Sequence, residues 1–250
     1  MRSVPGAILA VTVFTVACSA AVQSPCKFTS GGTAAVADVR DGRTIVLADG
    51  RELRLAAVEV TENSRGSLQS LVGGRDIRWE PVGSEPDRYG RLMAFIFTDE
   101  KGQSVQEMML EQGQARVSAR VGEKACANAL LAAERAARGA RRGLWSDPNF
   151  APLRSENPGR IAGMRGQFAL VEGKVLSVRE SGATIYLNFG PRRTRDFTVT
   201  VLKRHRRDFA AAGVDPNRLE GQQIRVRGWV EQRTGPVIEA AAPEQIELSE

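Results

Sequence analysis

Histidine and cysteine are scarce in this chain, and long hydrophobic runs are almost absent. Among 250 residues there is one histidine, His205, and there are three cysteines, none of them in a CxxC pair. A structural zinc site needs four closely spaced ligands, mostly histidine or cysteine, so these counts argue against one. Residues 7–17 form an apolar run that is too short to cross a bilayer as a helix, and no later run is long enough either.

The short apolar run has the features of an export leader. Arg2 supplies a positive start, and small residues at positions 19–21 suit a signal peptidase. We therefore expect residues 1–24 to be a signal peptide and the mature protein to be periplasmic or secreted. Lipidation at Cys18 is the alternative, although Thr15 is a poor substitute for the leucine that usually stands three residues before a lipidated cysteine.

Export gives the two remaining cysteines a meaning. In an oxidising compartment, Cys26 and Cys126 are expected to form one disulfide. This bridge would close a loop of ~100 residues and would add up to ~4–5 kcal/mol to the stability in the chain-entropy model.

The balance of charge favours polyanionic partners. There are 35 lysines and arginines against 29 acidic residues, which gives a net charge of +6 and an isoelectric point near 9.7. Nucleic acid, anionic lipid and cell-wall polymers all suit such a surface, and a generic solubilising charge is the simpler explanation. Charge alone does not decide between these readings.

Turn signals and alternating apolar residues predict a small barrel in residues 25–147. Asp49-Gly50 is a turn dipeptide, and Leu53 and Leu55 fall on one face of a strand. The expected strands are 33–40, 44–47, 52–56, 75–80 and 92–98, and the expected helices are 65–72, 104–112 and 125–142. Five short strands with a helix after the third are typical of an OB-type Greek-key barrel, so we expect a mainly β fold with packed helices.

A second β domain is expected in residues 165–250. Residues 148–164 contain three prolines and show no periodicity, which predicts a linker or a surface strap. The expected strands are 166–178, 183–189, 196–201, 222–230, 237–240 and 245–248, with a helix over 203–212. The pattern resembles a second OB-like barrel of the kind that binds single-stranded nucleic acid.

Six sequence marks carry a resemblance to a known family. They are Asp41-Gly42-x-Thr44, Arg54-Leu55, Glu62, Asp87-x-Tyr89-Gly90-Arg91, Gln112-Gly113 with Ala115, and Glu134-x-x-Ala137 ahead of Gly143-x-Trp145. In this order and spacing, residues 33–147 resemble the thermonuclease family, of which staphylococcal nuclease is the best-known member. The resemblance implies metal-assisted hydrolysis of phosphodiester bonds.

The same resemblance implies the catalytic residues. Arg54 and Arg91 match the two arginines that neutralise phosphate charge in the family, and Glu62 matches the glutamate that activates or orients water. A planar guanidinium binds two phosphate oxygens at once, and a carboxylate beside the water contributes about 10²–10⁴-fold as a general base. Taken singly, these three residues would be ordinary surface charges.

The calcium ligands that the resemblance implies are altered in this chain. Asp41 and Glu59 remain as weak candidates for metal ligands, but Arg43 stands where the family has an aspartate, and Val60 stands where it has a threonine. A hard dication does not tolerate a cation among its oxygen ligands, so we expect calcium binding to be absent or weakened. One hypothesis is that Arg43 supplies the positive charge itself, or pairs with Glu59 or Glu62.

Further residues are candidates for contact with nucleic acid, expected to be single-stranded DNA or RNA. Tyr89 matches a family position that packs on the substrate nucleotide, and Arg88 lies next to it. In the C-terminal part the basic candidates are Arg192, Arg193, Arg195, Lys203, Arg204, Arg206 and Arg207. His205 lies among these cations and is expected to have no chemical role.

Two main readings of function follow. The first is an exported thermonuclease-like phosphodiesterase that acts on DNA or RNA. The second is a catalytically inactive homologue that binds nucleic acid or another polyanion, and the replacement at Arg43 favours it. A protein-interaction scaffold is a third reading, because OB barrels serve many kinds of partner.

Overall fold

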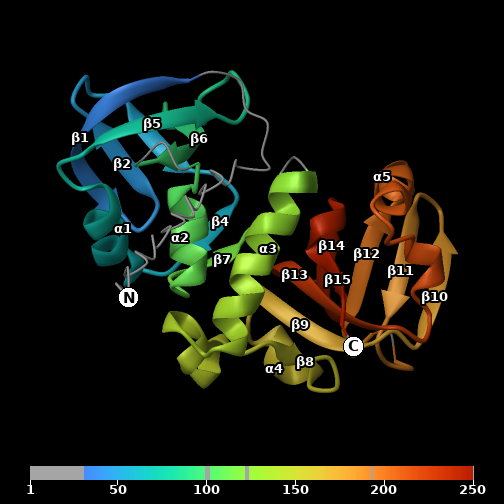
Figure 1. The fold of residues 1–250 in the computed structure, drawn as a ribbon. Helices are drawn as coiled ribbons and strands as arrows, with labels where there is room; N and C mark the ends of the chain where they lie inside the picture. The colour runs from blue at the N-terminus through green and yellow to red at the C-terminus, as the bar shows by residue number, and fades with distance from the viewer. Residues whose placement is uncertain (1–30, 99–101, 122–123, 193, 250) are drawn as a thin grey trace, which may run out of the picture.

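The computed structural model describes residues 31–98, 102–121, 124–192 and 194–249. They form two β-rich regions, and helix α3 lies between them (Figure 1). The expected leader, Cys18, Cys26 and Arg193 lie outside the described residues. None of the described helices is long and apolar enough to cross a membrane.

The N-terminal region is a closed barrel, as the sequence predicts. Its strands are β1 (Gly32–Asp41), β2 (Thr44–Leu47), β3 (Glu52–Leu55), β5 (Asp76–Pro81) and β6 (Leu92–Phe97). Neighbouring strands pair antiparallel except for β3 and β6, which run parallel. The fold class expected from the sequence, mainly β with a five-stranded barrel, is confirmed.

Helices and a two-stranded ribbon pack around this barrel. The elements are β4 (Val58–Val60), α1 (Ser64–Val72), α2 (Val105–Glu111), β7 (Ala115–Val117), α3 (Lys124–Gly139) and the 3-10 helix η1 (Gly143–Ser146). Strands β4 and β7 pair antiparallel with each other. Ser104 caps α2. Its hydroxyl accepts a hydrogen bond from the backbone N–H of Glu107, and the Glu107 carboxylate accepts one from the backbone N–H of Ser104. The sequence signals therefore place this helix start correctly.

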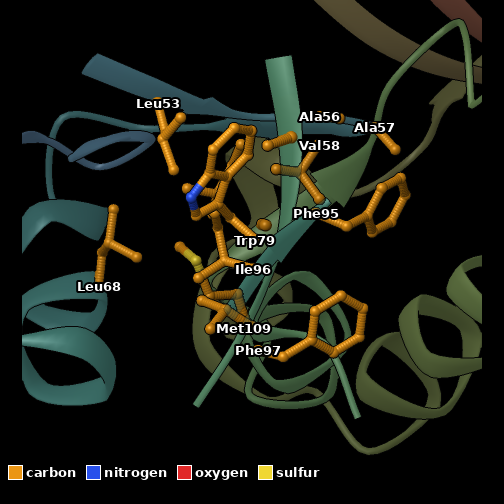
Figure 2. Close-up of a cluster of buried hydrophobic side chains, with 14 of the residues drawn as sticks. Leu53, Ala56, Ala57, Val58, Leu68, Trp79, Phe95, Ile96, Phe97 and Met109 are labelled. Carbon is orange, nitrogen blue, oxygen red and sulfur yellow. The ribbon is translucent and has the colours of Figure 1, made fainter. Parts of the chain in front are cut away.

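Alternation along the strands produces the barrel core. Leu53 and Leu55 are fully buried, and Ile77 and Trp79 point inward from β5. Figure 2 shows Leu53 and Trp79 in this core together with Ile96 and with Leu68 of α1. Burial of such side chains stabilises the fold by about 1.5–3 kcal/mol each. Cys126 is buried in the same core, and its predicted bridge to Cys26 stays a prediction.

The C-terminal region is a curled sheet. Its strands are β8 (Leu153–Arg154), β9 (Phe168–Lys174), β10 (Ser177–Ser181), β11 (Thr184–Asn188), β12 (Thr198–Leu202), β13 (Gln223–Gln232), β14 (Pro236–Ala240) and β15 (Ile246–Leu248). The strand order is β10-β11-β12-β14-β13-β9-β8, and β15 pairs with β13. The helical segments are η2 (Pro148–Phe150), α4 (Pro158–Ala162), η3 (Lys203–His205), α5 (Arg206–Ala211), η4 (Pro216–Arg218) and η5 (Pro243–Gln245).

Strand pairing follows a similar scheme in both regions. In the barrel, β3 runs parallel to β6, and the fourth strand, β5, returns to β1. In the C-terminal sheet, β12 runs parallel to β14, and β13 returns to β9. Only Val175 and Leu176 separate β9 from β10, so the two ends of this strand path are joined along the chain. The OB-like identity of the C-terminal region stays a prediction.

The expected linker packs into the C-terminal region. Leu153 lies in β8, which runs parallel to β9, and Ile161 of α4 is fully buried in the C-terminal core. Gly173 leaves room for this segment, since a Cβ atom there would lie 1.9 Å from Oγ of Ser155. Residues 148–164 therefore do not behave as a free tether.

A small hydrophobic cluster and a set of ion pairs join the two regions. Ala137 and Trp145 pack with Phe168 and Leu170 of β9. Arg227 of β13 reaches across to Glu134 of α3. The barrel and the curled sheet thus share one buried interface.

Candidate phosphate site of the barrel

A cleft of about 380 Å³ opens where β1, β2, β3 and β4 meet the start of α1. Its lining combines four arginines with three carboxylates. The lining residues are Arg40, Asp41, Gly42, Arg43, Arg54, Glu59, Val60, Thr61, Glu62 and Arg65. The structure therefore brings together Arg54 and Glu62, which the sequence predicts as catalytic, with Asp41, Arg43 and Glu59. We call this cleft the barrel pocket.

The turn between β1 and β2 fits closely against the loop that carries Glu62. A Cβ atom on Gly42 would lie 2.8 Å from Cβ of Ser64 and 3.1 Å from the carbonyl oxygen of Thr61, so the turn requires a glycine. Ser64 is itself buried, and its hydroxyl donates to the carbonyl of Gln114 at 2.7 Å. These contacts place Arg43 beside the segment from Glu59 to Glu62.

Arg43 is tied to the two carboxylates that the sequence marks as weak metal ligands. Its Nη1 donates to Oε2 of Glu59 at 2.6 Å, and its backbone N–H donates to Oδ1 of Asp41 at 2.8 Å. The Arg43 and Glu59 side chains are only 15% and 16% exposed. The Nε atom of Arg43 is buried and has no hydrogen-bond partner in the described part of the chain.

Arg54 has no acidic partner among the described residues. Its Nη1 lies 3.4 Å from Oγ1 of Thr44, which is a long hydrogen bond. Burial lowers the pKa of Arg54, and the positive charges of Arg43 and Arg91 lower it further. The residue stays protonated, because the ordinary pKa of arginine lies far above neutral pH. Arg54 is thus a half-buried cation beside two others.

Arg91 and Tyr89 belong to one turn that begins at Asp87. The Asp87 carboxylate accepts from Nε and Nη2 of Arg91 at 2.9 and 2.7 Å. These bonds lower the pKa of Asp87 to about 2 and raise the pKa of Arg91. The Tyr89 ring is exposed, and the guanidinium carbons of Arg88 and Arg91 lie 4.7 and 4.8 Å from its centroid.

Arg91 lies close to the barrel pocket without lining it. It precedes β6, whose Met93 pairs with Arg54 in the parallel ladder. The charge of Arg91 also contributes to the lowered pKa of Arg54. The structure thus places the three residues that the sequence predicts as catalytic around one corner of the barrel.

Comparison with protein families identifies the domain that contains Arg54, Glu62 and Arg91. Residues 52–147 match the family model of the staphylococcal nuclease homologues, from β3 through η1. These residues form a thermonuclease-like domain. No curated protein matches the chain.

Two further arginines line the barrel pocket, and sequence reasoning did not single them out: Arg65, which lies within the matched residues, and Arg40, which precedes them. Arg65 lines the pocket from the first turn of α1, and its Nε donates to the carbonyl of Val39 at 2.7 Å. Arg40 lines it from β1 and pairs with Glu52 at 2.8 Å. Their places beside the Asp41-Gly42 turn and just after Glu62 are the signals that could have found them.

Outside the thermonuclease-like domain, the basic candidates of the C-terminal region do not form one cluster. Arg192 and Arg195 lie in the loop before β12, whereas Lys203 and Arg204 follow the other end of the same strand. Lys203 is paired with Glu180 at 2.7 Å, and Arg206 lies 3.6 Å from Asp215. Arg207 is exposed. The two groups are therefore separate basic patches.

In the described residues, no group of three or more carboxylate, histidine or cysteine side chains could hold a metal ion. In the barrel pocket, the candidate metal ligands Asp41 and Glu59 are both hydrogen-bonded to Arg43. The chemistry that the barrel pocket presents is thus a set of arginines with a nearby exposed carboxylate, Glu62.

Proposed function

We propose that the thermonuclease-like domain is a phosphodiesterase that hydrolyses DNA or RNA at the barrel pocket. The observation that carries this proposal is that Arg54 and Glu62 line one pocket, with Arg91 at its corner. A phosphodiester brings negative charge to the pocket. Arginines fixed beforehand by the fold stabilise the additional charge that develops in the transition state.

The reaction proposed for the pocket is hydrolysis by a water molecule. Water attacks phosphorus and gives up a proton to Glu62, while the bond from phosphorus to one ester oxygen breaks. The leaving oxygen takes a proton from solvent water and departs as a hydroxyl group, a phosphate monoester remains, and Glu62 returns its proton to solvent. Arg54 and Arg91 bind the non-bridging oxygens through the step.

We also propose that the family's use of calcium is altered in this domain. The support is the position of Arg43, whose Nη1 lies 2.6 Å from Oε2 of Glu59. A calcium ion needs six to eight oxygen ligands, and it would meet a positive charge where it needs an oxygen. Calcium therefore does not fit this pocket, and no step of the proposed reaction depends on it.

A second candidate function is nucleic-acid binding without cleavage. The observation that favours it is again the ion pair between Arg43 and Glu59, because it engages one of the two candidate metal ligands of the pocket. In this reading the exposed ring of Tyr89 stacks on bases, and the C-terminal basic patches add contacts to the backbone. Single-stranded nucleic acid is the expected partner, since aromatic stacking needs unpaired bases.

The test is a cleavage assay on single-stranded DNA and RNA with the mature protein. Glu62→Gln is expected to lower cleavage by about 10²-fold or more, the contribution of a general base. Glu85→Gln, an exposed acid outside the pocket, is the matched control and should cleave like the wild type. Tight, salt-sensitive binding with no cleavage by any of the three proteins would support the binding function instead.

We propose further that the protein is exported. The support is the leader-like composition of residues 1–24. Mass spectrometry of the protein recovered from a periplasmic fraction should show an N-terminus near Pro25. A full-length chain in the cytoplasm would contradict the proposal.

A further inference from the structure

Arg43 is more enclosed than Arg40 and Arg65 in the barrel pocket, and it keeps unused donors. Its side chain is 15% exposed, whereas the Arg40 and Arg65 side chains are 58% and 57% exposed. Nη1 is engaged by Glu59, but Nε is buried with no partner in the described residues. A buried donor without an acceptor costs free energy, so an anion that reached it would be favoured.

Arg54 provides the second half of an anion site. Its guanidinium has no carboxylate within salt-bridge distance among the described residues. Burial lowers its pKa most, and the charges of Arg43 and Arg91 lower it further. Repulsion of this kind between neighbouring cations is relieved when an anion binds between them. Guanidinium groups match the paired oxygens of a phosphate group better than a point charge does.

Glu59 explains how Arg43 stays in place when the pocket is empty. Strand β4 carries Glu59 and pairs with β7, which packs on α2 and α3, so the carboxylate is held by the core of the domain. The Glu59 carboxylate balances the charge of Arg43 and uses only one of its amino groups. The guanidinium is thereby oriented in advance, and a ligand need not order a flexible side chain.

We propose that Arg43 takes the place of a divalent cation in the barrel pocket. The pocket binds a phosphate ester of nucleic acid directly, through Arg43 and Arg54, and needs no metal ion to do so. This inference rests on the proposed function, because it concerns the same pocket. It names the class of ligand as a phosphodiester or phosphomonoester that binds without a metal.

Calorimetry with the dinucleotide pTpT tests the proposal on the mature wild-type protein. Binding is expected to be equally tight in EDTA and in excess calcium, and calcium alone should give no binding heat. Binding that appears only with calcium would overturn the proposal. Absence of binding in both buffers would overturn it as well.

Variants at position 43 test the proposal in two directions: one should lose pTpT binding, and the other should gain calcium binding. Arg43→Gln is expected to weaken pTpT binding at least tenfold in both buffers, because charge-assisted hydrogen bonds are lost. Arg43→Asp adds a carboxylate beside Asp41 and Glu59, so it should bind calcium and should bind pTpT only when calcium is present. Arg51→Gln, which removes an exposed arginine outside the pocket, is the control and should match the wild type.

Thermal melting of each variant shows whether it is folded. If Arg43→Asp is unfolded without calcium, a melting temperature that rises with calcium still supports the proposal. Weakened binding in Arg43→Gln with a wild-type melting temperature supports it too. Wild-type affinity for pTpT in Arg43→Gln would overturn it.

The outcomes for this proposal and for the proposed hydrolysis are separable. Tight pTpT binding in EDTA without cleavage of any substrate supports the role of Arg43 and contradicts hydrolysis. Cleavage that strictly requires calcium contradicts the role of Arg43 and leaves hydrolysis standing. Cleavage in EDTA that Glu62→Gln abolishes supports both.

Discussion

Two of the places where arginines and carboxylates meet in the described residues differ in how completely their charges are matched. In the barrel pocket, Arg54 has no acidic partner among the described residues, and Arg43 keeps a buried Nε without an acceptor. In the second place, the interface between α3 and β13, Arg227 and Glu134 are almost completely buried and are bonded to each other twice. We call this second group the interface cluster.

Glu134 is fully satisfied in the interface cluster. Its Oε2 accepts from the backbone N–H of Val117 at 2.6 Å and from Nη1 of Arg227 at 2.8 Å. Its Oε1 accepts from Nη2 of Arg227 at 3.0 Å and from Nη1 of Arg138 at 2.7 Å. Arg227 also donates to the carbonyl of Val117 and to Glu247 of β15. Nε of Arg227, like Nε of Arg43, is buried without a hydrogen-bond partner in the described residues. Every oxygen of Glu134 is nevertheless bonded, and this carboxylate holds α3 to β7 and β13.

The comparison teaches that unmatched charge, more than the number of arginines, marks a binding site. Burying an ion pair is costly unless every hydrogen bond is made, and the interface cluster meets that condition for Glu134. The barrel pocket instead has Arg54 in the lining of an open cleft, with no acidic partner among the described residues. A ligand is thus needed to complete the barrel pocket, whereas the interface cluster is completed by the C-terminal region.

The largest expected effect comes from breaking the interface cluster. Arg227→Met leaves the buried charge of Glu134 without its main partner, and we expect a loss of about 3–5 kcal/mol in the free energy of unfolding. Urea denaturation measures it. The double variant Arg227→Met/Glu134→Gln should recover part of the loss, because the uncompensated charge is gone.

Arg54→Gln in the barrel pocket is the matched comparison for that experiment. Removing an unmatched cation should change the free energy of unfolding by no more than about 0.5 kcal/mol, in the range of ordinary surface substitutions. If Arg54→Gln and Arg227→Met destabilised the protein equally, the contrast between the two clusters would be wrong.

The second largest expected effect is a loss of stability at acidic pH, which acts through Glu134 of the interface cluster. Burial works to raise the pKa of Glu134, but the charges and hydrogen bonds of Arg227, Val117 and Arg138 outweigh it, so the pKa is lowered from its ordinary 4.5. A carboxylate with a lowered pKa in the folded state stabilises the protein above its unfolded pKa, and that contribution is lost as the pH falls through the folded pKa. Stability should therefore decline below about pH 4.5.

Urea midpoints measured across this acidic range test the role of Glu134. Glu134→Gln should be less stable near neutral pH and should lose less stability on acidification than the wild type. Glu85→Gln, which removes an exposed acid, should keep the wild-type slope. Equal slopes in Glu134→Gln and the wild type would show that other carboxylates cause the acid sensitivity.

The fold of the barrel could be predicted from local patterns, and the interface could not. Leu53 and Leu55 alternate along the chain and are buried as that alternation predicts. Arg225 and Arg227 alternate with Ile224 and Val226, a pattern that is typical of a solvent-facing edge. Arg227 is buried, and it bonds to Glu134 of α3 and to Val117 of β7, which both lie far away in the sequence.

The candidate site was predictable only in part, for a related physical reason. Arg54, Glu62 and Arg43 could be named from their spacing and from a family likeness, because β3, β4 and the adjacent turn are close in sequence. The proline-rich residues 148–164 predicted a linker or a surface strap, and the pattern did not indicate that Leu153 and Ile161 are buried in the C-terminal core. Composition reports local backbone preference and does not report which distant surface a segment covers.

The smallest expected effect belongs to the turn that carries Arg91. Asp87 accepts two hydrogen bonds from the Arg91 side chain, and they hold its pKa at about 2. In Arg91→Gln these charged donors are gone, so the pKa of Asp87 should return toward its ordinary value of 3.8. Carboxyl chemical shifts in an acid titration by NMR report this change directly.

Because the turn that carries Arg91 is exposed, we expect little change in the free energy of unfolding of Arg91→Gln, whereas phosphate binding at the barrel pocket should weaken. If the Asp87 titration did not move, Arg91 would be free to leave Asp87 for a ligand without cost, and it would belong with the unmatched cations of the barrel pocket.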